Sequence, residues 1–140
     1  MNIYIGSDHA GFELKNLLVQ RHPHFIDIGC KGLDSVDYPD YANLVCEKMK
    51  TDPTALGILI CGSGQGVCMR ANKFSHIRAA LVYNDEVTKL SREHNDANVI
   101  CIGSRFASSE NAIKWINIFI NTPFSEGRHR QRVDKISQST

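Results

Sequence analysis

The chain has 140 residues, of which 42% are hydrophobic and 22% are charged, the composition of an ordinary globular domain. Sixteen lysines and arginines against fifteen aspartates and glutamates leave a formal charge of +1, which argues against binding to nucleic acid or an anionic membrane through bulk charge. No uncharged apolar run approaches the roughly 20 residues that a membrane helix needs. The five cysteines are odd in number and form no C-x-x-C pair, which indicates reduced thiols in a cytoplasmic protein.

Short apolar segments alternate along the chain with longer segments of helical period. The segment 56–61 is apolar throughout, which is typical of a strand covered on both faces. Asn84 and Ser108 stand where they can cap the last two predicted helices. In chain order, the sequence predicts strands over residues 2–6, 24–28, 56–61, 78–83 and 98–103, and helices over residues 12–21, 41–50, 66–73, 85–94 and 109–120.

Five strands that alternate with five helices predict βαβ units and a parallel sheet. We therefore expect an α/β fold, a three-layer αβα Rossmann-like sandwich with a five-stranded parallel sheet whose strand order stays open. Residues 1–140 are expected to form one domain, with a polar, arginine-rich tail at 123–140 that carries one short helix. Ligands of such sheets bind beyond the carboxyl ends of the strands, which selects the loops at 6–11, 61–66 and 103–105.

The segment 61–66, Cys-Gly-Ser-Gly-Gln-Gly, joins a buried strand to a helix. Its three glycines let the backbone approach a ligand, so that N–H groups can face a phosphate or a developing oxyanion. The alternative is a tight structural turn, and Val67 stands where a dinucleotide motif would need its third glycine. Cys61 at the strand end could act as a base or nucleophile, or could be a small buried hydrophobe like the other four cysteines.

Two polar pairs stand out elsewhere. The Asp8 carboxylate could bind sugar hydroxyls and the His9 imidazole an anion, while helix capping is the alternative for Asp8. His94 and Asn95 end the fourth predicted helix, where the helix dipole alone favours a histidine. Because His94 precedes the last strand, it lies about one strand length (~16 Å) from Cys61. Either His94 is structural, or a second copy of the chain delivers it.

The tail contains a basic cluster. Arg128 and Arg132 fall four residues apart, on one face of a helix, and can hold a phosphate through paired donors. A solvated charge run is the alternative, and a nucleic-acid patch is disfavoured because the cluster is short and without interleaved aromatics. A metal site is not expected, since the pair His22 and His24 has no further ligand beside it.

Together, these segments resemble the ribose-5-phosphate isomerase type B family, which also includes the galactose-6-phosphate isomerase subunits. The resemblance covers nearly the whole chain. Two departures are Ser63, where many members carry threonine, and Gln65, which is larger than the usual small residue. The resemblance rests on six blocks in the family's order: GSDHAGF at 6–12, DYPDYA at 37–42, ICGSGQG at 60–66, ANK at 71–73, SREHNDANV at 91–99 and GRHRQRV at 127–133.

The resemblance implies a cofactor-independent aldose–ketose isomerase that interconverts ribose 5-phosphate and ribulose 5-phosphate through a cis-enediolate. It also implies a homodimer with shared active sites, which could pair into a tetramer. The charge, hydropathy and ligand spacing described above predict no nucleic-acid, membrane or metal partner. Cys61 would be the base and His94 would open the sugar ring. The implied substrate-binding residues are Asp8 at the sugar hydroxyls, Gly62, Ser63, Gly64, Gln65 and Gly66 at the enediolate oxygens, Asn95 on the open chain, and His9, Arg128 and Arg132 at the phosphate.

Two other functions stay open. One is isomerisation of a six-carbon phosphosugar such as allose or galactose 6-phosphate, because substrate length depends on a gap between Cys61 and the arginines that the sequence does not fix. The other is a non-catalytic sensor that binds a phosphosugar with the same loops. A sensor would not require both Cys61 and His94, so the sequence favours an enzyme.

Overall fold

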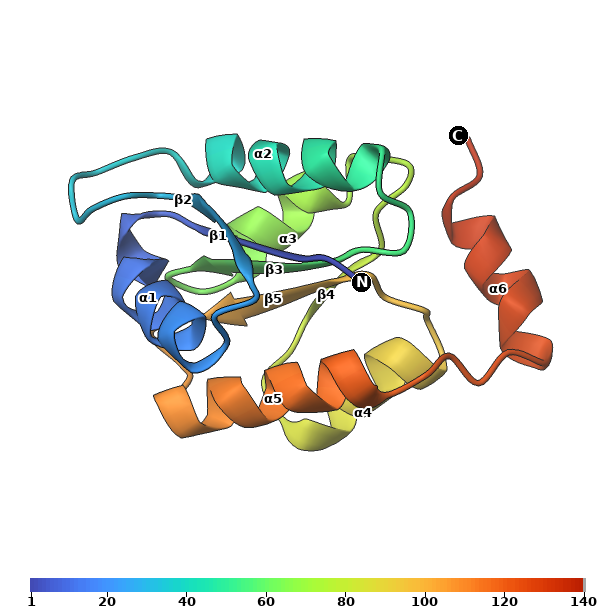
Figure 1. Cartoon of the computed structure of the whole chain (residues 1–140). Coiled ribbons are helices and arrows are strands. Elements are labelled where there is room, and N and C mark those ends of the chain that lie inside the picture. Colours follow the sequence, from blue (N-terminus) through green and yellow to red (C-terminus); the bar gives the residue numbers. More distant parts are fainter. Residues whose placement is uncertain (140) are drawn as a thin grey trace.

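The computed structural model describes residues 1–139, and its centre is a five-stranded sheet in which all neighbouring strands run parallel. The strand order is β2-β1-β3-β5-β4. Helices cover both faces of the sheet (Figure 1), so the predicted three-layer αβα sandwich is confirmed. The elements are β1 (Ile3–Ser7), a short 3-10 helix (His9–Gly11), α1 (Phe12–Arg21), β2 (Ile26–Gly29), α2 (Tyr38–Lys50), β3 (Leu56–Cys61), α3 (Gln65–Ala71), β4 (Ala79–Leu81), α4 (Asp85–Glu93), β5 (Val99–Gly103), α5 (Ser109–Asn121) and α6 (Arg128–Ile136).

The central strand β3 divides the core into two layers because its side chains alternate between the faces of the sheet. Ile58 and Ile60 pack in the cluster that contains apolar side chains of α1 and α5. Leu59 and Cys61 pack in the cluster formed with α2 and α3. Cys61 therefore faces the layer of α2 and α3.

Most predicted elements are found close to their expected bounds, and the differences have local causes. Helix α2 begins at Tyr38 rather than at residue 41, since Pro39 fits the first turn of a helix, where its missing N–H is not needed. Strand β4 has three residues instead of six and pairs only with β5. The two predicted caps are confirmed: the side chain of Asn84 accepts from the N–H of Val87, and that of Ser108 from the N–H of Asn111.

The register of the sheet places the two ends of the strands far apart. Gly57 pairs with Val99 and Cys61 pairs with Gly103, so about 13 Å of strand separates these two levels. We call the side where the strands end the carboxyl edge and the opposite side the amino edge. Helix α6 stands beyond the amino edge and apart from the helical layers (Figure 1).

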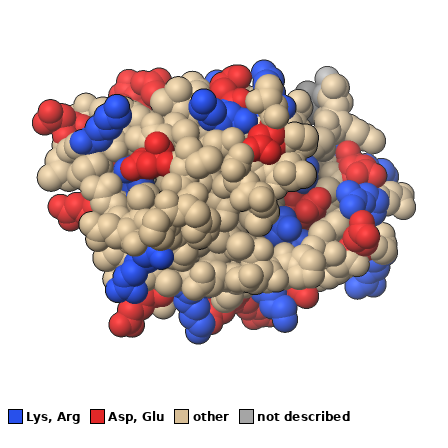
Figure 2. Space-filling view, viewed as in Figure 1, with Lys and Arg blue, Asp and Glu red and all other residues tan. Residues whose placement is uncertain are grey.

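The distribution of surface charge and the length of the helices agree with the near-neutral charge and the lack of a long apolar run in the sequence. In the view of Figure 2, acidic and basic side chains are interspersed and neither sign gathers in one large patch. Among residues 1–139, no helix is both long enough and apolar enough to cross a membrane.

Candidate active site

The loops after β1 and β3 meet at the carboxyl edge, at the point where the strand order reverses. The chain leaves β1 toward β2 on one side and continues with β3 on the other, which is where open α/β sheets bind ligands. The N–H of Asp8 donates to the carbonyl oxygen of Ile60, at 3.2 Å. The hydroxyl of Ser104 in the loop after β5 donates to the carbonyl oxygen of Ala10, at 2.8 Å. Hydrogen bonds thus join the three loops selected from the sequence.

Cys61 is buried at the carboxyl edge, with 4% of its surface exposed, and the glycine turn folds over its sulfur. The N–H of Gly64 donates to Sγ at 3.2 Å, a contact that stabilises negative charge on the sulfur. The N–H groups of Gly62 and Ser63 have no hydrogen-bond partner within the described part of the chain. A thiol therefore lies beside two unused backbone donors, as proton abstraction next to a carbonyl requires.

Two glycines of the turn lie against neighbouring residues where a Cβ would collide. Gly64 has a φ of +77°, and a Cβ there would lie 2.7 Å from Cδ1 of Leu81. A Cβ on Gly66 would collide with the ring of Tyr38, which would have to move. Gln65 begins α3 and its N–H donates to the hydroxyl of Ser63, so the larger side chain at 65 leaves the turn intact.

Asp8 and His9 lie in the neighbouring loop. Asp8 is 6% exposed and its Oδ1 accepts from the N–H of Gly11, at 3.1 Å, so the capping alternative is present in the structure. The second carboxylate oxygen remains available for a ligand hydroxyl. Nδ1 of His9 accepts from the N–H of Val36, at 3.1 Å. Because that nitrogen must be unprotonated, the donor of this imidazole is Nε2–H.

The structure adds two side chains that the sequence reasoning did not assign to the site. The guanidinium of Arg105 lies over Gly62, within 3.2 Å of where a Cβ would stand, and the backbone N–H of Arg105 donates to the Gly62 carbonyl oxygen. The Tyr38 ring covers Gly66 and is 40% exposed. Both residues could have been found from the sequence. Arg105 is the positively charged residue of the third selected loop, 103–105, and Tyr38 belongs to the DYPDYA block at 37–42.

The remaining predicted residues gather at the amino edge. The rings of His94 and His129 stack, with centroids 4.3 Å apart and planes at 15°. Burial lowers the pKa of His129, and the nearby His94, Arg128 and Arg132 lower it further. Asn95 lines a cavity of about 630 Å³ between the start of β4 and the end of α6. All of the predicted residues in this group are exposed: His94, Asn95, Arg128 and Arg132.

The predicted site residues therefore form two groups within one chain. Cys61, the glycine turn, Asp8 and His9 lie at the carboxyl edge, and the histidine and arginine cluster lies at the amino edge. The α4 end bearing His94 precedes β5, so the whole length of that strand separates the two groups. Neither group contains three His, Cys, Asp or Glu residues placed to hold a metal ion, and the same is true throughout residues 1–139.

Comparison with known proteins identifies the family of the chain. A model of the family described as Ribose/Galactose Isomerase matches residues 3–136. The chain belongs to this family. Among curated relatives of the isomerase, a probable ribose-5-phosphate isomerase B of Mycoplasma pneumoniae is 50% identical over 139 residues, which cover 96% of this chain and 91% of the relative.

Solved structures resemble the isomerase over nearly its whole length. Ribose-5-phosphate isomerase B from Mycoplasma genitalium with bound ribulose-5-phosphate has a TM-score of 0.94 and 43% identity, and the match covers 97% of this chain and 93% of that one. Ribose-5-phosphate isomerase B from Clostridium thermocellum has a TM-score of 0.92 and 42% identity, with 98% and 95% covered. These likenesses establish the fold and the isomerase family.

Proposed function

We propose that the isomerase interconverts ribose 5-phosphate and ribulose 5-phosphate by moving one proton between C2 and C1 through a cis-enediolate. The observation that carries this proposal is the buried Cys61 thiol beneath a glycine turn with two unused N–H donors. It is supported by the 43% identical Mycoplasma genitalium enzyme, whose structure has ribulose-5-phosphate bound.

The carboxyl edge supplies the proton transfer. Cys61 as thiolate removes the proton from C2 of the open-chain aldose and returns it to C1, while the hydroxyl proton of C2 passes to the oxygen of C1. Negative charge then develops on the oxygens of C1 and C2, where the N–H groups of Gly62 and Ser63 can stabilise it. Gly64 keeps the turn over the sulfur, and Asp8 accepts hydrogen bonds from sugar hydroxyls. No metal is needed for these steps, because backbone dipoles act on the enediolate.

The amino edge supplies ring opening and phosphate binding. His94 protonates the ring oxygen of the furanose as the C1 hydroxyl loses its proton to solvent, and Asn95 binds the open chain that results. Arg128 and Arg132 on α6 hold the phosphate as paired cations. His9 Nε2–H, and Arg105 beside the glycine turn, are further donors for the phosphate at the carboxyl edge. Binding the phosphate remote from C1 and C2 fixes the sugar for the reaction.

One chain cannot bring these two edges to a single sugar, so we infer a homodimer in which each site takes one edge from each copy. An interface with two-fold symmetry forms two such sites at once. The cavity beside Asn95, and the position of α6 apart from the body, leave room for a second copy there. Pairs of such dimers would give a tetramer.

A mixing experiment tests the shared site. Cys61→Ala and His94→Asn proteins, each nearly inactive, are unfolded together and refolded as a mixture. Half of the random dimers are mixed, and each mixed dimer has one intact site, so about a quarter of wild-type activity should return. The same variants refolded separately are the control. A mixture that stays inactive would contradict the shared site, and so would a fully active monomer.

Substrate length is a separate question, because the family description joins ribose and galactose isomerases. We expect the highest kcat/KM on ribose 5-phosphate. Rates of the purified protein on ribose 5-phosphate, allose 6-phosphate and galactose 6-phosphate decide this point. A higher kcat/KM on either six-carbon substrate would reject the five-carbon assignment while leaving the isomerase chemistry in place.

We also propose that the chain works as a single domain in the cytoplasm. Both helical layers pack on the same sheet, which supports one domain over residues 1–140. All five cysteines are free thiols, which suits a reducing compartment.

A further inference from the structure

Asp96 directly follows His94 and Asn95 and ends the turn that projects them from α4. Its φ is +48°, in the left-handed region that few residues other than glycine adopt. The N–H of Asp96 donates to the carbonyl oxygen of Arg92, at 3.2 Å, so this residue closes the helix. Whatever holds Asp96 therefore also holds His94 and Asn95.

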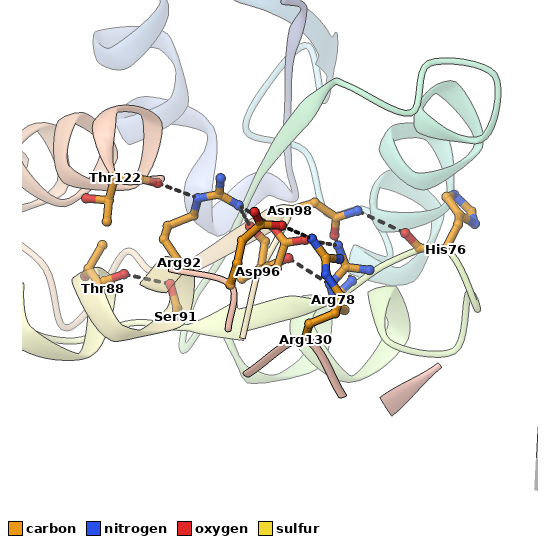
Figure 3. Close-up of polar contacts among 11 residues, drawn as sticks. His76, Arg78, Thr88, Ser91, Arg92, Asp96, Asn98, Thr122 and Arg130 are labelled. Carbon is orange, nitrogen blue, oxygen red and sulfur yellow. Dashed lines mark hydrogen bonds and ion pairs between the residues drawn. The ribbon is translucent and has the colours of Figure 1, made fainter. Parts of the chain in front are cut away.

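Two arginines from different elements clamp the Asp96 side chain (Figure 3). Nη2 of Arg78, just before β4, lies 3.3 Å from Oδ2, and Nε of the same arginine donates to the Asp96 carbonyl oxygen at 2.8 Å. Nη1 of Arg92 lies 3.3 Å from Oδ1. The side chains of Arg78 and Arg92 are 22% and 14% exposed. Burial lowers the pKa of Arg92 and the Asp96 carboxylate opposes this, so the carboxylate balances a guanidinium that has lost most of its water.

The same group of charges reaches the root of the C-terminal tail. Nε of Arg92 donates to the carbonyl oxygen of Thr122, at 3.1 Å (Figure 3). The N–H of Ser125 donates to the carbonyl oxygen of Glu93, at 3.1 Å. On α6 itself, the hydrogen bond to Glu126 raises the pKa of Arg130, and the Asp96 carboxylate adds to that rise. Asp96 thus lies where α4, β4 and the segment leading to α6 meet.

We propose that Asp96 is a positioning residue of the isomerase. By holding Arg78 and Arg92 together, it fixes the turn that carries His94 and the root of the tail that carries the phosphate-binding arginines. The inference rests on the proposed function, in which these side chains complete the site of a second copy. Since a displacement of about 1 Å can cost about a hundredfold in rate, loosening Asp96 slows ring opening while Cys61 is untouched.

Asp96→Asn tests this, because it removes the charge and keeps the shape. We expect conversion of ribose 5-phosphate to fall about ten- to a hundredfold. Exchange of the C1 hydrogen of saturating ribulose 5-phosphate with D₂O needs the base but no ring opening, because this ketose cannot close a furanose ring through its phosphorylated O5. That exchange stays near the wild-type rate. Loss of folded protein would lower both rates alike, so the ratio of the two is the readout.

Asp52→Asn is the matched control. The carboxylate of Asp52 also accepts two side-chain hydrogen bonds, from Asn2 and Tyr4 at 2.9 Å, and neither partner belongs to the turn of His94. This variant should leave the ratio at the wild-type value. A ratio lowered equally in both variants would overturn the positioning role, since it would then follow from any lost carboxylate.

A double variant separates this inference from the proposed function. Asp96→Asn added to His94→Asn should cause no further loss of kcat on saturating ribose 5-phosphate, because the ring-opening group that Asp96 positions is already removed; a disturbed tail would raise KM instead. Losses of kcat that multiply would overturn the inference. If His94→Asn lowers the ratio and Asp96→Asn leaves it unchanged, the inference is overturned while the proposed function stands. A wild-type ratio in His94→Asn would instead overturn the role of His94, and with it both proposals.

Discussion

The two edges of the sheet hold their functional groups by different physical means. At the carboxyl edge, Cys61 and Asp8 are buried, and backbone hydrogen bonds and glycine geometry place them. At the amino edge, His94 and the α6 arginines are exposed, and ion pairs around Asp96 place them. The groups of the first edge are placed by the folding of one chain, while the second edge presents exposed charged groups that, in the proposed dimer, complete the site of another copy.

Cys61→Ala should have the largest effect, because it removes the base from the edge that performs the chemistry. A general base is worth about 10²–10⁴ in rate, and we expect kcat to fall by about 10⁴. Calorimetric titration with ribulose 5-phosphate should still show binding, since the phosphate contacts remain. Turnover within a few-fold of wild type would remove Cys61 from the base role.

His94→Asn should have the next largest effect and a different signature. Loss of the acid that opens the ring should slow ribose 5-phosphate conversion by about 10². Hydrogen exchange at C1 of ribulose 5-phosphate should change little, in contrast to Cys61→Ala, which should abolish it. An equal fall in both rates would mean that the two edges do not divide the reaction as proposed.

Gly64→Ala tests whether backbone geometry alone determines the carboxyl edge. The positive φ and the contact with Leu81 should lower the free energy of unfolding by about 1–3 kcal/mol, measured by chemical denaturation. Gly32→Ala is the control, because a Cβ at Gly32 meets nothing within 4 Å. Equal stabilities of the two variants would show that the turn adapts.

A smaller effect is expected from pH, and it belongs to the amino edge. His129 has a lowered pKa in the folded chain, so the unfolded chain binds more protons as the pH falls below about 6.5. The free energy of unfolding should therefore decrease between pH 7.5 and pH 5.5, and His129→Gln should remove part of that decrease. His24→Gln, an exposed histidine outside the cluster, serves as comparison. If His129→Gln left the change of unfolding free energy with pH unaltered, the lowered pKa of His129 would be contradicted.

The sequence predicted the carboxyl edge better than the amino edge, for a physical reason. Strand β3 and helix α1 have their predicted bounds, because apolar runs and helical periodicity are local signals. The loop rule for parallel sheets then located Cys61 and Asp8. Strand order, the Tyr38 and Arg105 contacts and the ion pair of Arg78 with Asp96 depend on residues distant in the chain. At the amino edge, the short tail helix with Arg128 and Arg132 and the separation of His94 from Cys61 could be anticipated, since they follow from local spacing and chain order.

The length of β5 between the two edges has an evolutionary consequence. If one copy contributes the base and another the acid, as in the proposed dimer, a duplicated gene could lose the Cys61 edge in one product and the His94 edge in the other. The pair would still assemble one working site, and each product would be inactive alone. A sheet that separates its catalytic groups by the length of one strand is therefore suited to becoming an obligate two-gene enzyme, without any change of fold.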